Sequence, residues 1–154
     1  MLDGLFVTPV ATAIDEALAS AGVPAERGSA GAIAVVGNAR LAAALAALGA
    51  GRDVIPVGMS PRAAKKLPRH LPDTSSLEAG SLAAVVGVDV AIDDAWEDTL
   101  RAWVRVVRDG GAIVFVDRGA AQEASRRALC AGLSELEQRR AGRAVVTSGL
   151  VTHL

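Results

Sequence analysis

The chain has 154 residues, of which 51% are hydrophobic and 21% are charged, so we expect one folded globular domain and exclude a disordered chain. The formal net charge of −1 gives no electrostatic reason to expect binding to nucleic acid or to a membrane surface. A single cysteine, Cys130, excludes an intramolecular disulfide, and the two histidines, His70 and His153, do not have a metal-ligand spacing. No apolar run is as long as a membrane span, and Asp3 and Gly4 do not suit a signal peptide, so the expected location is cytoplasmic.

In the first half of the chain, apolar residues recur with helical spacing in two segments and run continuously in two others. Continuous apolar runs are typical of strands that are buried on both faces of a parallel sheet. The predicted elements are a helix that Thr8 caps and Gly22 ends, a strand over 32–36, a helix from Leu41 to Gly49, and a strand over 54–57. Pro56 lacks a backbone donor, which places the last strand at an edge of the sheet or at an irregularity.

The second half continues this alternation and then changes character. The predicted elements are a helix between Ser60-Pro61 and Pro68, an irregular stretch over 70–81, a strand over 82–88, an amphipathic helix over 95–108, a strand over 112–116, a helix over 120–131, and strands over 133–138 and 144–150 joined by a turn at 139–142. Asp109-Gly110-Gly111 ends the amphipathic helix, and Cys130, between apolar neighbours, is expected to be buried. The order predicts the α/β class for a single domain, residues 1–154. We expect a mostly parallel central sheet, helices on both faces and an antiparallel C-terminal hairpin.

Four phrases of the sequence, from about residue 9 to the end, follow one another in the order found in a known family. They are "LAALGAGRDVIPVGMSPRAAKKL", "SSLEAGSLAAVVG", "RVVRDGGAIVFVD" (residues 105–117) and the terminal "AGLSELEQRRAGRAVVTSGL". Together they resemble the class I S-adenosylmethionine-dependent methyltransferases. The resemblance implies a Rossmann-like sheet and a ligand site at the carboxyl ends of its strands.

The residues that usually hold the cofactor in that family are replaced here. Val35 stands where an acid usually precedes a Gly-x-Gly-x-Gly loop, and the turn Gly37-Asn38-Ala39-Arg40 is about two residues short of that loop. Gly58 stands where a second acid usually accepts hydrogen bonds from the ribose hydroxyls, and Ala83 replaces a third acid. We therefore expect a degenerate cofactor site with no bound cofactor, and S-adenosylmethionine only if the chain is an active enzyme.

The residues that any ligand at this site would meet are Gly37, Asn38, Ala39, Arg40, Gly58, Met59, Asp73, Thr74 and Asp89. Each also has a purely structural interpretation: Gly37 as a tight turn, Asn38 as a helix N-cap, and Asp73 and Thr74 as loop caps. Asp89, Asp93, Asp94 and Asp117 follow strands at the carboxyl edge and suit either a general base or a cap, with Asp93 or Asp94 capping the 95–108 helix. The sequence assigns no catalytic residue and no metal site.

Three functions are compatible with these observations, and the replaced acids favour the first, which is not an enzyme. The first is a non-catalytic methyltransferase-like domain that acts through protein contacts as a scaffold or regulator. The others are an active methyltransferase with an atypical short loop, and a binder of another small ligand in the same crevice. For the first function, the candidate interaction surface is Leu2, Leu5, Phe6, Leu150, Val151 and Leu154, which pairs with a protein partner or a second copy unless it packs on the sheet.

Overall fold

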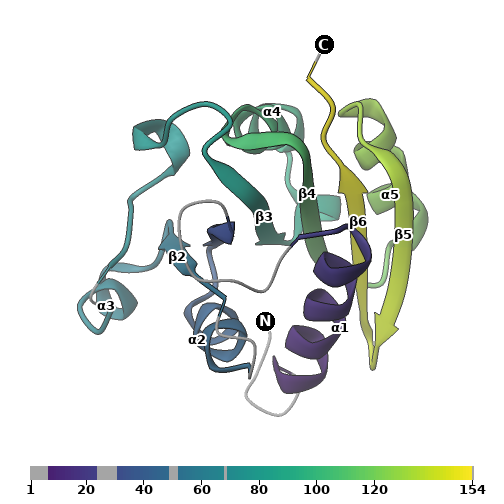
Figure 1. The fold of residues 1–154 in the computed structure, drawn as a ribbon. Helices are drawn as coiled ribbons and strands as arrows, with labels where there is room; N and C mark the ends of the chain where they lie inside the picture. The colour runs from purple at the N-terminus through teal and green to yellow at the C-terminus, as the bar shows by residue number, and fades with distance from the viewer. Residues whose placement is uncertain (1–6, 24–30, 49–51, 68, 154) are drawn as a thin grey trace.

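The computed structural model describes residues 7–23, 31–48, 52–67 and 69–153 (Figure 1). Its strands are β1 (Ile33–Val36), β2 (Val54–Val57), β3 (Leu82–Val88), β4 (Val107–Arg118), β5 (Ser134–Ala141) and β6 (Ala144–Leu150). They form one sheet in the order β2-β1-β3-β4-β6-β5, in which β2, β1, β3 and β4 are parallel and β6 is antiparallel to β4 and β5. The prediction of a mostly parallel sheet with an antiparallel C-terminal hairpin is confirmed.

Helices cover both faces of this sheet. They are α1 (Val7–Ser20), α2 (Ala39–Ala47), α3 (Pro61–Ala64), α4 (Trp96–Val106) and α5 (Ala121–Cys130), with short 3₁₀ turns η2 (Thr74–Ser76) and η3 (Val90–Ile92). Figure 1 shows α1 and α2 on one side of the sheet and α4 and α5 on the other. Because side chains alternate along a strand, Ile33 and Val35 of β1 join the core under α1 and α2, whereas Ala34 joins the core under α4 and α5.

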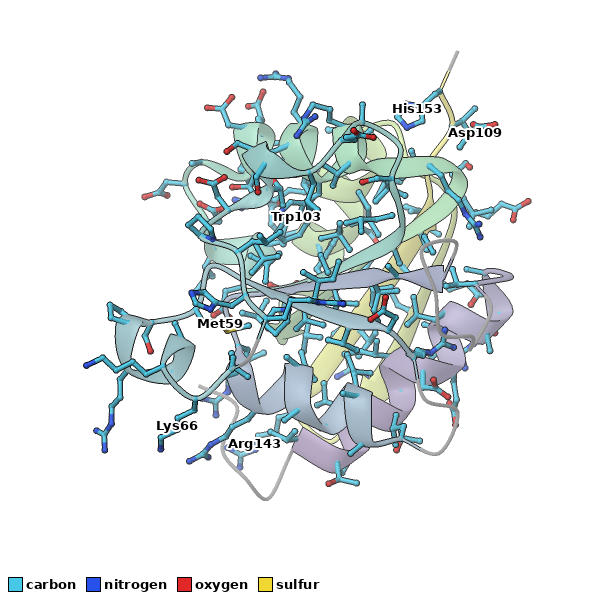
Figure 2. The ribbon with its side chains drawn as sticks, turned by 60° about the vertical axis from the view of Figure 1, so that its left-hand side comes forward. Met59, Lys66, Trp103, Asp109, Arg143 and His153 are labelled. Atoms are coloured by element: carbon cyan, nitrogen blue, oxygen red, sulfur yellow. The ribbon has the colours of Figure 1, made fainter. Side chains whose placement is uncertain are left out.

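A close helix–sheet contact brings α4 against β3. Trp103 of α4 is buried, and a Cβ atom added at Gly87 of β3 would lie 2.1 Å from its Cη2 atom. Only glycine therefore leaves room for the indole ring at this point of the strand. Figure 2 shows Trp103 on the α4 side of the molecule and Met59 near α3, away from it.

Several predicted boundaries are wrong. Thr8 lies inside α1 and does not cap it, because the chain is already helical at Val7. The helix predicted over 95–108 ends at Val106, and β4 begins at Val107 with an irregularity before Ala112, since Val107 pairs with Leu82 and Ala112 with Ala84.

At the C-terminal hairpin, the turn lies at Gly142 and Arg143, so Arg139 and Arg140 belong to β5 and not to the turn. Gly142 has a φ of 62°, a backbone conformation that suits a tight hairpin turn. Cys130 is exposed and not buried, because α5 turns Ala124 and Ala128 to the sheet and leaves its last residue outside.

The stretch over 70–81 contains a single parallel bridge, between Leu71 and Val57 of β2, and otherwise irregular backbone. The expectation of an irregular segment is confirmed. Pro56 lies in β2, whose outer side has only this bridge among the residues that the structure describes, so its missing donor removes no strand-to-strand ladder bond there.

Candidate functional site

The turn at the carboxyl end of β1 leads directly into α2. The Gly37 N–H donates to the Val57 carbonyl at 2.9 Å, and its φ of 80° is a conformation that glycine adopts without strain. The Asn38 side chain accepts from the Leu41 N–H at 2.9 Å and caps α2. The structural interpretations of Gly37 and Asn38 are therefore confirmed. Ala39 is the first helical residue, and Arg40 is exposed beside it.

Gly58 ends β2 beside this turn. Its φ is 65° and its N–H donates to the Leu71 carbonyl at 2.8 Å. An added Cβ would make only ordinary contacts, 3.6 Å from the Pro72 carbonyl oxygen and 3.8 Å from Val36 Cγ1. Backbone conformation, and not lack of space, therefore favours glycine here. Met59 follows and is half-buried against the core under α1 and α2.

The other two positions where the family usually has an acid lie in the core. Val35 and Ala83 are both fully buried in the cluster that α1 and α2 cover. Their side chains fill apolar space, so a carboxylate at either position would be buried among hydrocarbon groups.

Asp73 and Thr74 organise the loop after β2. Asp73 caps η2, where its carboxylate accepts from the hydroxyl and the N–H of Ser75, and both bonds lower the pKa of Asp73. The Thr74 carbonyl accepts from the Arg105 guanidinium of α4 at 2.9 Å. The capping interpretation is confirmed for Asp73.

A second group of acids lies at the carboxyl ends of β3 and β4. Asp89 directly follows β3 with a φ of 61°, and its N–H donates to the Val116 carbonyl at 2.9 Å. Asp117, near the end of β4, is only 3% exposed. Its Oδ1 accepts from the Ala91 N–H at 2.8 Å, whereas its buried Oδ2 has no hydrogen-bond partner. The β3–β4 cavity, of about 170 Å³, is lined by Asp89, Ala91, Ile92, Asp117, Arg118 and Ala120.

Burial sets the proton affinity of this acid pair. Desolvation raises the pKa of Asp117, and the charge of Asp89 raises it further, against the opposing effects of the Ala91 N–H and of Arg127. Desolvation also raises the pKa of Asp89, against the charge of Arg118. Perturbed acids of this kind are more frequent at functional sites than elsewhere.

Asp93 was expected as a possible cap of α4, but the N-cap position is occupied by Ala95. The Asp93 carboxylate instead accepts from the Ala95 N–H and from the Thr99 hydroxyl, both at 2.8 Å, and so ties the residues before the helix to its first turn. Asp94 is exposed.

The structure thus divides the predicted ligand-site residues into two groups. Gly37, Asn38, Ala39, Arg40, Gly58, Met59, Asp73 and Thr74 lie around the ends of β1 and β2, and Asp89 lies at the end of β3 beside Asp117. Sequence reasoning placed Asp117 at this edge as either a general base or a cap, and did not choose between the two. The only signal was its position after a buried strand, because the N–H group that binds its Oδ1 belongs to Ala91, 26 residues away.

The predicted interaction surface is described only in part. Leu2, Leu5, Phe6 and Leu154 lie outside the described residues. Val151 is 1% exposed, and its backbone pairs with Gly110 and Gly111, so its side chain belongs to the core and offers no surface. Leu150 is half-buried at the end of β6.

Two kinds of site are absent from the described residues. None of the helices in this part of the chain has the length and apolar character needed to cross a membrane. Among the same residues, no three His, Cys, Asp or Glu side chains gather in a way that could hold a metal ion.

No family model matches the sequence, and no curated protein matches it. Solved structures do match. One is a Methanococcus maripaludis protein assigned to the S-adenosyl-L-methionine-dependent methyltransferases (TM-score 0.71, 15% identity, 98% of this chain and 89% of that one). Another is a complex between the Haloferax volcanii Trm112 methyltransferase activator and a protein assigned as a methyltransferase (TM-score 0.71, 15% identity, 96% and 91%). A third is geranyl diphosphate methyltransferase in complex with SAM (TM-score 0.65, 12% identity, 92% and 85%).

The expectation that no cofactor is involved is corrected by these structures. Besides the geranyl diphosphate enzyme with SAM, matches include PigF with SAH and the Thermus thermophilus rRNA methyltransferase RsmC with AdoMet and guanosine. The match spans 49% of PigF and 36% of RsmC, so it covers about half or less of those proteins. A fold that holds S-adenosylmethionine in other proteins does not support an expectation of none. The chain has the fold of the class I S-adenosylmethionine-dependent methyltransferases.

Proposed function

We propose that this chain is an S-adenosylmethionine-dependent methyltransferase of atypical construction. The observation that carries the proposal is the Asp89–Asp117 pair, two desolvated carboxyls beside a cavity at the edge where ligands bind in open α/β sheets. The fold of the solved structures supports the class of cofactor.

The residues around the ends of β1 and β2 fit a cofactor held through backbone and shape. Nothing lies within 4 Å of the missing Cβ of Gly37, so the space beside this exposed turn is open and a ligand can approach its backbone. Arg40, exposed in the first turn of α2, is a cation that suits the carboxylate of an amino-acid moiety. Gly58 is exposed and offers no carboxylate for ribose hydroxyls, so binding is weaker than in relatives with an acid there.

When bound, S-adenosylmethionine would supply an activated methyl group. Methyl transfer depends mainly on holding the acceptor in line with that group, which is a task of position and shape. An acceptor that loses a proton needs a base, and Asp89 and Asp117 are carboxyls with raised pKa values at the ends of β3 and β4. Such carboxyls are better proton acceptors than ordinary aspartates once they are ionised.

Calorimetric titration with S-adenosylmethionine and S-adenosylhomocysteine tests the proposal. We expect saturable binding tighter than about millimolar. Arg40→Ala should weaken it, whereas Arg101→Ala, which removes an exposed arginine from α4, should not. Absence of saturable binding of both compounds would overturn the proposal.

A second candidate function is a scaffold or regulator that acts through protein contacts. Its support is the exposure of two large apolar side chains, Ile92 of η3 at 71% and Leu129 of α5 at 63%. The Haloferax match is a complex with an activator protein, and this supports partnering in that protein. Sedimentation of the wild type and of Leu129→Ser tests the idea: a mass above the monomer that Leu129→Ser reduces supports self-association, and a monomer in both cases contradicts it.

A further inference from the structure

Strand β5 forms one edge of the sheet. It is the last strand in the sheet order, and Figure 1 shows it at the opposite end of the sheet from β2. Its inner side pairs with β6, and its outer side makes no backbone hydrogen bond to any other residue that the structure describes. A strand edge of this kind presents N–H and C=O groups that can pair with a further strand.

The register of the hairpin determines which backbone groups of β5 point outward. The pair Ala141–Ala144 flanks the two-residue turn and is therefore a hydrogen-bonded pair. Hydrogen-bonded and non-hydrogen-bonded pairs alternate along an antiparallel ladder. The outward groups are therefore the N–H and C=O of Gln138 and of Arg140, together with the Leu136 carbonyl.

The charges along β5 have opposite signs in its two halves. Glu135 and Glu137 precede Gln138, and Arg139 and Arg140 follow it. A strand with charges of one sign would repel a second copy of itself in any register. An acidic half followed by a basic half is instead complementary to itself when the two copies run antiparallel.

Arg139 and Glu137 both lie on the face of β5 that α1 covers. The Arg139 guanidinium donates to the Ser20 hydroxyl at 2.8 Å and lies 3.6 Å from the Glu16 carboxylate, so it is already held against α1. The Glu137 side chain is 52% exposed, and its carboxylate lies 3.4 Å from Arg139. An ion pair this exposed contributes little within one chain, and both groups can accept a second partner at a small cost in side-chain entropy.

We propose that β5 pairs antiparallel with β5 of a second copy of this chain, with Gln138 opposite Gln138 on a two-fold axis. In this register the Gln138 backbones bond to each other, and each Arg140 N–H donates to the Leu136 carbonyl of the other copy. Glu137 then lies opposite Arg139 of the other copy in a non-hydrogen-bonded pair, where side chains approach most closely. The dimer is closed, because each copy has used its β5 edge, and it does not depend on the proposed methyl transfer.

Sedimentation equilibrium of the full chain between about 1 µM and 1 mM tests the pairing. One strand from each copy buries less than about 1,200 Å², so we expect a reversible dimer with a dissociation constant in the micromolar-to-millimolar range. A chain that stays monomeric over this range, or that forms assemblies larger than a dimer, would overturn the proposal.

Two charge variants test the register. Glu137→Arg puts an arginine opposite Arg139 of the other copy, and Arg139→Glu puts a glutamate opposite Glu137. Each variant alone should raise the dissociation constant by about tenfold or more, whereas an equal mixture of the two should restore dimers, because every arginine then faces a glutamate. Glu78→Arg makes the same charge change at an exposed position outside β5 and should change the constant by less than about twofold. A mixture that stays monomeric would overturn the proposal.

A second pair of variants tests the backbone contact without altering Glu137 or Arg139. Arg140→Pro removes an outward N–H at an edge position, where proline is tolerated, and Arg140→Ala removes the same side chain but keeps the N–H. The dissociation constant of Arg140→Pro should exceed that of Arg140→Ala by about tenfold or more. Circular dichroism reports whether each variant is folded, and this pair decides the question if Arg139→Glu unfolds. Equal constants for the two folded variants would contradict the pairing.

Leu129→Ser separates this interface from the exposed apolar side chain of α5. The β5 dimer should persist in Leu129→Ser, and a dimer that Leu129→Ser dissociates while Arg140→Pro leaves it intact would overturn the proposal. Titration with S-adenosylhomocysteine tests the enzyme separately. Failure of that ligand to bind removes the proposed methyltransferase and leaves the β5 dimer, whereas a monomer that binds the ligand removes the β5 dimer alone.

Discussion

The two halves of the sheet's carboxyl edge differ in how completely their polar groups are used. At the ends of β1 and β2, the N–H groups of Gly37 and Gly58 and the side chain of Asn38 are all bonded within the fold. At the ends of β3 and β4, two carboxyls are desolvated, and one oxygen of Asp117 has no partner.

This difference shows how each half can bind a ligand. The β1–β2 half has no unsatisfied buried polar atom among the described residues. A ligand there gains contact and shape complementarity but supplies no missing hydrogen bond. The β3–β4 half carries a buried oxygen without a partner and two acids with raised pKa values, and perturbed acids are more frequent at functional sites. We therefore expect selectivity for chemical groups to come from the β3–β4 half.

The largest effect should follow from returning an acid to the β1 position. Val35→Glu puts a carboxylate at a fully buried site in the core under α1 and α2, and should destabilise the domain by about 4 kcal/mol or more. Urea denaturation measures this. Val36→Glu, at the half-buried next residue, is the control and should cost less. Equal stability of the two variants would mean that position 35 can accommodate the acid.

The second-largest loss of stability should come from disturbing the contact that holds β3 against α4. Gly87→Ala places a methyl group 2.1 Å from Trp103 Cη2, so it should cost about 1–3 kcal/mol through overpacking. The double variant Gly87→Ala/Trp103→Leu makes room for the methyl group, and in a urea double-mutant cycle its cost should be less than the sum of the single costs. Additive costs would show that the two residues do not press on each other.

Gly58→Asp sharpens the comparison because it gives the β1–β2 half the carboxylate that it lacks. The positive φ of Gly58 should cost about 1 kcal/mol of stability, and the new acceptor should strengthen S-adenosylhomocysteine binding by about tenfold. Gly58→Asn has the same backbone strain without the charge and serves as the control in the titration. Equal affinity of the Asp and Asn variants would argue against a ribose near this residue.

The smallest effect concerns pH. Burial raises the pKa of folded Asp117 above its ordinary value of 3.8, so the folded state keeps this proton while the unfolded state loses it. The stability contributed by the protonated carboxyl is complete below pH 3.8 and is lost as pH rises through the folded pKa. The stability of Asp117→Asn relative to the wild type, measured by thermal unfolding, should therefore increase as pH rises from about 3 to 8. Asp94→Asn should have the same pH dependence of stability as the wild type. A stability difference between Asp117→Asn and the wild type that does not change with pH would contradict this account.

The features that the sequence predicts well are local. Continuous apolar runs predict the buried strands, and a single glycine followed by asparagine predicts the turn and the cap before α2, because both are set by neighbouring residues. The alternation of these elements is sufficient to predict the α/β sheet and its final hairpin.

The features that the sequence does not predict depend on residues far apart in the chain. Val151 is buried because its backbone pairs with Gly110 and Gly111, and Cys130 is exposed because α5 presents another face to the sheet. One oxygen of Asp117 is bonded by a loop folded back from β3, and the other stays unpaired. The expectation of no cofactor relied on three replaced acids, but two of those positions lie in the core, where their replacement reflects packing as much as ligand binding.

One measurement tests the division of the edge into two halves most directly: amide chemical-shift mapping of the labelled chain with S-adenosylhomocysteine. The account predicts that this ligand shifts the signals of Gly37–Arg40, Gly58 and Met59 more than those of Ala91 and Ala120. Absence of shifts at the first group of residues, or equal shifts in both groups, would contradict the account.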